Sequence, residues 1–80
     1  HELPTLNIET EIIRDKKFID LSWENDGFKM PIEIIFNSFD GKRERKLELT
    51  NSPNRIAIPA DSELILDPDG WLLYHQNIKN

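Results

Sequence analysis

The 80-residue sequence contains no cysteine, which excludes disulfide bonds and thiolate metal sites. Its longest apolar runs span only a few residues, whereas crossing a bilayer takes roughly 20, and no basic-then-apolar signal segment opens the chain. Basic residues are scarce, with ten Lys and Arg against fifteen Asp and Glu and a net charge of −5. A nucleic acid or an anionic membrane surface normally requires a basic face. We therefore expect neither a nucleic-acid partner nor a membrane partner.

The chain length allows one modest hydrophobic core, so we expect a single domain over residues 1–80. Without disulfides, its stability has to come from packing, and nothing in the composition indicates more than a monomer. The sequence begins at His1 rather than at a methionine. This start favours a fragment of a larger protein, although proteolytic processing produces the same result.

Apolar and polar residues alternate with a period of two through most of the chain, which is typical of strands with one buried face. Helix is nearly absent from the pattern. The predicted strands are 6–13, 18–24, 30–37, 43–50, 56–58, 64–66 and 71–74. Seven short strands joined by tight turns favour an all-β fold, an antiparallel two-sheet sandwich of immunoglobulin-like type. A small closed barrel is the alternative.

The same pattern predicts which large side chains are buried. Trp23 shares a face with Ile19 and Leu21, and Ile34 lies in the most apolar strand, so Trp23 and Ile34 are predicted to lie in the core. Asp40-Gly41 is the strongest short hairpin signal. Trp71 follows a turn and opens the last predicted strand. We predict that it is mostly buried and closes one end of the sandwich.

The opening residues His1-Glu2 resemble the start of the zinc-binding pattern H-E-x-x-H. Thr5 occupies the position of the second histidine, and Pro4 is unsuited to the middle of the helix that this motif requires. His75 is the only other histidine, and no convergent partners are evident for it. We therefore predict no metal site and interpret His75 as a solvated residue at a sheet edge.

Asp67 and Asp69 have the spacing of a fragment of a calcium loop, since carboxylates two residues apart can converge on one hard cation. The remainder of that loop pattern is missing. A turn opened by Asp67, with Pro68 next and Gly70 at its end, accounts for the same residues. We predict the turn.

The one basic cluster consists of Lys42, Arg43, Arg45 and Lys46, and Glu44 interrupts it. Charged residues on the strands of a hairpin discourage edge-to-edge aggregation. A solvated hairpin tip is the favoured interpretation, and a docking patch for an acidic neighbour is the alternative.

Three aromatic residues, Phe39, Tyr74 and Trp71, are candidate contacts for a sugar or a peptide, and Phe39 beside the hairpin turn is the one most expected to be exposed. No serine, lysine or carboxylate pair has the setting of a nucleophile or of an acid/base pair. The residues therefore predict a structural or binding domain with no catalytic, cofactor-binding or metal-binding residues and no cofactor of its own.

Several phrases together resemble a known domain: Leu3-Pro4 with Leu6, then Trp23, then 28–34 (FKMPIEI) and 66–73 (LDPDGWLL). The chain resembles, over essentially its whole length, the β-sandwich domain that follows the catalytic domain in the aminopeptidase N family of zinc metallopeptidases. The family's catalytic H-E-x-x-H helix and G-x-M-E-N loop have no counterpart here.

The resemblance implies a parent that removes N-terminal residues from peptides with zinc-activated water, the zinc lying in the catalytic domain. It implies an exported or periplasmic bacterial protein, although the residues themselves leave the compartment open. The expected function is a non-catalytic module that packs against the catalytic domain of the same chain. The alternative is a free-standing sandwich that binds carbohydrate or mediates adhesion through Phe39, Tyr74 and Trp71.

Overall fold

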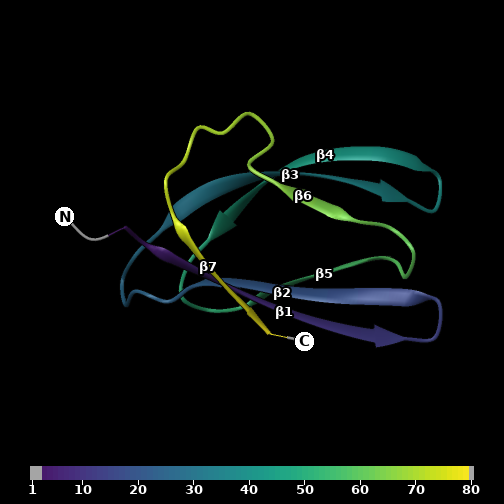
Figure 1. Cartoon of the computed structure of the whole chain (residues 1–80), viewed down its shortest axis with the longest axis horizontal. Helices are drawn as coiled ribbons and strands as arrows, with labels where there is room; N and C mark the ends of the chain where they lie inside the picture. The colour runs from purple at the N-terminus through teal and green to yellow at the C-terminus, as the bar shows by residue number, and fades with distance from the viewer. Residues whose placement is uncertain (1–2, 80) are drawn as a thin grey trace.

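The computed structural model describes residues 3–79, which form seven strands (Figure 1). In chain order they are β1 (Thr5–Ile13), β2 (Lys16–Trp23), β3 (Met30–Ser38), β4 (Gly41–Leu49), β5 (Asn54–Pro59), β6 (Leu64–Leu66) and β7 (His75–Lys79). The predicted all-β class is confirmed. No helix among the described residues is both long enough and apolar enough to cross a membrane.

The strands form two sheets that lie face to face, with β3, β4 and β6 above β1, β2, β5 and β7 in Figure 1. The four-stranded sheet has the order β5-β2-β1-β7, and the three-stranded sheet has the order β4-β3-β6. All neighbouring strands are antiparallel except β1 and β7, which run parallel. The two-sheet arrangement is that of a β-sandwich, as predicted.

Two tight hairpins fix the register of the long strands. In the first, Ile13 pairs with Lys16, and Arg14 takes the left-handed conformation with φ 57°. In the second, Ser38 pairs with Gly41, so the tip is formed by residues 39–40. The predicted hairpin is therefore present, with its turn one residue earlier than the Asp40-Gly41 signal indicates. Gly41 supplies the positive φ of 129° that the first residue of β4 requires.

The core lies between the sheets because each strand directs alternate side chains inward. The buried apolar side chains are Leu6, Ile8, Ile19, Leu21, Trp23, Ile32, Ile34, Phe36, Leu49 and Ile58. Trp23 is 1% exposed and Ile34 is fully buried, which confirms both predictions. The Trp23 indole N–H donates to the Met30 carbonyl at 2.9 Å. Phe28 and Tyr74 meet the Trp23 ring edge-on, so this aromatic group closes one end of the core.

The prediction for residues 71–74 is wrong in two respects. These residues form no strand, and the last strand is β7, which pairs with β1 instead of extending the three-stranded sheet. Trp71 is 77% exposed, so it does not close an end of the sandwich. The cause is Asp67, whose carboxylate accepts hydrogen bonds from the backbone N–H groups of Trp71 and Leu72. This capping holds the chain with Leu72 against the core and Trp71 in solvent.

Candidate functional site

The residues considered for zinc do not form a site in the part of the chain that can be placed. His1 and Glu2 lie outside the described residues, and Thr5 begins a strand where the motif needs a helix. His75 is exposed at the start of β7, where its backbone N–H donates to the carbonyl of Pro4 at 2.9 Å. Within residues 3–79, no three histidine, aspartate or glutamate side chains are grouped as metal ligands.

Asp67 opens a turn, as predicted, because the Gly70 N–H donates to the Asp67 carbonyl at 2.9 Å. Its two carboxylate oxygens accept from the Trp71 and Leu72 N–H groups at 3.1 and 2.9 Å. Asp67 also takes the left-handed conformation, with φ 46°. The carboxylate that the calcium interpretation would need therefore serves as a cap for the β6–β7 loop.

The basic cluster is divided between the two faces of β4. Arg43 pairs with Phe36 and Arg45 with Ile34, so both arginines lie on the core side of the strand. Lys42 and Lys46 alternate with them and lie on the outer face. All four side chains are exposed. The prediction of a solvated hairpin agrees with this placement, whereas a single basic patch does not.

Asp40 at the tip of the same hairpin is held by its neighbours. The Ser38 hydroxyl donates to it at 2.6 Å and Arg43 donates at 2.7 Å. The hydrogen bond from Ser38, followed by the charge of Arg43, lowers the pKa of the Asp40 carboxyl below its usual value. These contacts stabilise the turn locally.

The three candidate aromatic residues do not form one platform. Phe39 is 65% exposed, as predicted, at the β3–β4 tip. Trp71 lies beside Met30 and Pro31 at the other end of β3, and a strand of nine residues spans about 25 Å. Tyr74 packs against Trp23 in the core. The predicted set of three contacts is therefore separated by the fold.

One end of the molecule does expose large apolar side chains. Trp71 and Leu73 are each 77% exposed and Leu3 is 42% exposed. The β1–β7 register begins where Thr5 pairs with His75, and Leu3 and Leu73 each lie two residues before that pair. We call these three residues the apolar end. A hollow of about 360 Å³, lined in part by Met30 and Trp71, borders it.

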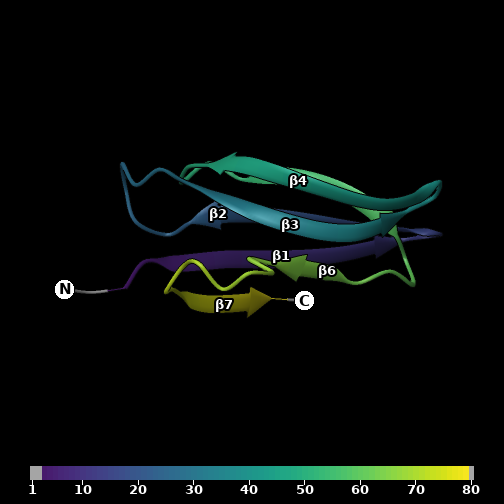
Figure 2. The same cartoon turned by 90° about the horizontal axis from the view of Figure 1, so that it is seen from above.

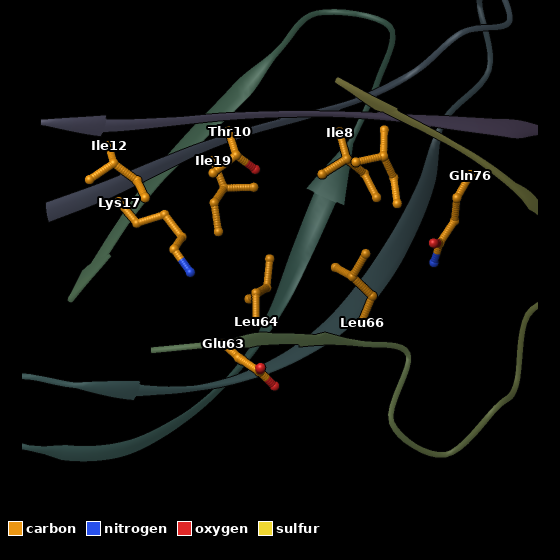
Figure 3. A pocket seen from close by; sticks show the side chains of 10 residues that line it. Ile8, Thr10, Ile12, Lys17, Ile19, Glu63, Leu64, Leu66 and Gln76 are labelled. Atoms are coloured by element: carbon orange, nitrogen blue, oxygen red, sulfur yellow. The ribbon is translucent and has the colours of Figure 1, made fainter. Parts of the chain in front are cut away.

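A second apolar feature is a groove of about 530 Å³ between the sheets, along the side formed by β6 and β7 (Figure 3). Its lining is Ile8, Thr10, Ile12, Lys17, Ile19, Glu63, Leu64, Leu66, Gln76 and Ile78. Ile12 and Ile78 are each 60% exposed. The Lys17 ammonium donates to the Ser62 carbonyl at 2.6 Å and so joins β2 to the segment that leads into β6. We call this feature the side groove.

Charged residues on the outer face of the four-stranded sheet satisfy one another. Arg55 donates to both carboxylate oxygens of Asp20, at 2.9 and 3.0 Å, and to Glu11 at 3.4 Å. Its guanidinium lies 5.2 Å from the centre of the Phe18 ring. The hydrogen bond from Arg55 lowers the pKa of Asp20, and the same bond raises that of Arg55. This closed network has a structural role.

The residues that sequence reasoning missed are those of the side groove and the apolar end. Alternation in β1 does indicate that Ile8 and Ile12 share a face, but not that the opposite sheet leaves Ile12 uncovered. Ile78 carried no strand signal because β7 alternates too weakly. The scan against protein-family models found no match, and the search of curated proteins found no relative.

Proposed function

We propose that this chain is a non-catalytic β-sandwich domain of a zinc-dependent aminopeptidase and packs against the catalytic domain of the same polypeptide. The observation that carries the proposal is the apolar end, where Trp71 and Leu73 are held in solvent by a capped loop. Large apolar side chains grouped at a surface are typical of an interface.

The energetics favour burial of this end against a neighbour. A tryptophan side chain buries about 150–250 Å² when it is covered, and apolar burial contributes about 25 cal/mol per Å². Covering Trp71 alone is therefore worth several kcal/mol before the cost of association. The Asp67 carboxylate already fixes the loop in one conformation, so little further ordering is required on docking.

The resemblance to the aminopeptidase domain points to the same surface. Trp71 and Leu73 belong to the phrase 66–73, and Leu3 belongs to the opening phrase. Both of these segments thus contribute exposed apolar residues to the apolar end. A sequence kept for interdomain packing would retain such residues although the isolated domain does not bury them.

An immunoglobulin-like topology is part of the proposal. It is supported by the neighbours β1-β2-β5 in one sheet and β3-β6 in the other, which correspond to strands A, B and E and strands C and F of that fold. The last strand departs from the pattern, because β7 lies beside β1 and not beside β6.

A free-standing ligand-binding sandwich is the second candidate, and the exposure of Trp71 beside the hollow at Met30 favours it. The two candidates predict different behaviour of the same indole. An interdomain contact buries Trp71 permanently in the longer protein, whereas a ligand-binding aromatic stays accessible until the ligand is added.

The test compares residues 1–80 with the longer polypeptide that the proposal requires. We expect the longer protein to contain H-E-x-x-H upstream, to hydrolyse an aminoacyl chromogenic substrate, and to protect Trp71 from acrylamide quenching of its fluorescence. Trp23 is buried in the isolated domain and serves as the internal control. A reading frame without a metallopeptidase contradicts the proposal. If acrylamide still quenches Trp71 in the longer protein, and only an added oligosaccharide protects it, the result favours the second candidate.

A further inference from the structure

Among residues 3–79, no strand pairs with one edge of β6, and we call this the free edge. The register shows which backbone groups of β6 point toward it. The strand β6 lies at the end of the order β4-β3-β6, so β3 is its neighbour on one side only. The Asp67 N–H donates to the Glu33 carbonyl, and bonded pairs alternate in an antiparallel ladder. Ile65, two residues before Asp67, therefore bonds to Ile35. The backbone groups of Leu64 and Leu66 consequently point away from the sheet.

The side groove lies along this free edge, and the side chains of Leu64 and Leu66 point into it (Figure 3). The opposite wall comes from β1, β2 and β7, whereas the three-stranded sheet ends at β6. The uncovered position beside β6 is where the immunoglobulin-like pattern places its last strand. An added strand there would cover Ile12 and Ile78.

The segment around β6 is acidic. Residues 60–70 contain four carboxylates, Asp61, Glu63, Asp67 and Asp69, and no lysine or arginine. Asp61 and Glu63 precede β6 and are exposed, and Asp69 is exposed after it. An apolar strand with basic residues at both ends is complementary to this pattern.

We propose that the side groove binds an extended segment of a partner protein, which pairs with the free edge of β6 as an added strand. The segment alternates apolar and polar residues, with its apolar side chains in the groove and a lysine or arginine at each end. Main-chain hydrogen bonds to Leu64 and Leu66 supply the pairing, and the apolar pockets select the sequence. This site lies apart from Trp71. Its groove and strand edge do not depend on the proposed function, and only the comparison with the last strand rests on the immunoglobulin-like topology proposed above.

The first experiment uses the 1–80 domain and the peptide acetyl-KTVTVTVK-amide, followed by amide NMR. We expect saturable shifts at β6 and β7 and slower hydrogen exchange at the Leu64 and Leu66 amides. The Ile65 amide, which already bonds to β3, should change little. A peptide with glutamate at both ends should bind about tenfold more weakly, and one with a central proline should lose binding.

Two surface variants locate the site without disturbing the core. Ile78→Lys places a charge in the groove at a residue that is 60% exposed, and we expect at least an about tenfold loss of peptide affinity. Ile13→Lys is the matched control, because Ile13 is 46% exposed on the opposite face of β1 from Ile12. The Ile13→Lys variant should bind the peptide with the same affinity as the unmodified domain.

The proposal is overturned if neither Leu64 nor Leu66 gains protection, or if Ile13→Lys weakens binding as much as Ile78→Lys. It is also overturned if the domain alone forms dimers in sedimentation with those two amides protected, since a second copy would then occupy the groove. Binding of the glutamate-ended peptide with equal affinity removes the charge selectivity and contradicts the stated partner.

Discussion

The two long sides of the sandwich are bordered by edge strands of opposite character (Figure 2). On the β4–β5 side, Arg43 and Arg45 point toward the core side of β4, and Ile58 of β5 is fully buried. On the β6–β7 side, Ile12 and Ile78 are each 60% exposed. We call the first the closed side and the second the open side.

Edge strands with unpaired backbone groups tend to pair with other chains, and inward-pointing charges are one of the devices that prevent this pairing. The closed side has that protection, in Arg43 and Arg45. The open side has Gln76 and the rim residues Lys17 and Glu63, but its centre is aliphatic. The difference indicates that the open side is the one suited to a partner, because it combines a free edge with uncovered apolar area.

The largest expected effect on stability comes from comparing isoleucine-to-alanine substitutions on β5 and β7, the two edge strands of the four-stranded sheet. Ile58→Ala on the closed side removes a fully buried side chain, and we expect a loss of about 2–5 kcal/mol in the free energy of unfolding. Ile78→Ala on the open side should cost less than about 1 kcal/mol. Urea denaturation of both variants checks this, and equal losses would mean that the side groove is filled in solution.

The next effect concerns Asp67, which caps the loop that connects β6 to β7 and so shapes the open side. Asp67→Ala leaves two backbone N–H groups without their acceptor and places alanine at φ 46°. We expect a loss of about 1–2 kcal/mol and faster rotation of Trp71 in fluorescence anisotropy. Asp67→Asn is the control, because asparagine tolerates this conformation and keeps one acceptor. An alanine variant as stable as the asparagine variant would refute the capping role.

A smaller effect comes from the Arg55–Asp20 pair, which joins β5 to β2 beside the closed side. The pKa of Asp20 is lowered in the folded state, so its stabilisation is present above about pH 4 and is lost as the pH falls through the lowered value. Arg55→Met should lower the midpoint of thermal unfolding slightly at neutral pH, because the ion pair is exposed to solvent. The difference in thermal unfolding midpoint between this variant and the unmodified domain should shrink as the pH falls. A difference that does not change with pH would argue against a stabilising Arg55–Asp20 pair.

The smallest effect on stability, and the sharpest test of edge protection, is Arg43→Thr combined with Arg45→Thr. Both side chains are exposed, so the free energy of unfolding should change by no more than about 0.5 kcal/mol. We expect the unprotected β4 edge to cause concentration-dependent association in sedimentation velocity. Lys42→Thr with Lys46→Thr makes the same change in net charge on the outer face and should stay monomeric. Association of both variants alike would assign the effect to net charge.

Much of the fold followed from local pattern. Period-two alternation located β1 to β6 within a few residues, because one face of each strand meets a core that only apolar side chains can fill. It also identified Trp23 and Ile34 as core residues. The prediction for Trp71 was wrong because the Asp67 cap redirects the chain, and no alternation pattern encodes a side-chain-to-backbone bond. The strand β7 was missed for a second reason, which is that its alternation is weak.

The sequence by itself determined the all-β class, the hairpins and the inward faces, since these depend on neighbouring residues and on turn chemistry. It did not determine that β7 pairs with β1, which leaves β6 at an edge and opens the side groove. Strand pairing between distant segments depends on how whole faces cover one another. Only the tertiary structure therefore decided which apolar residues, such as Ile58, became core and which, such as Ile78 and Trp71, remained at the surface.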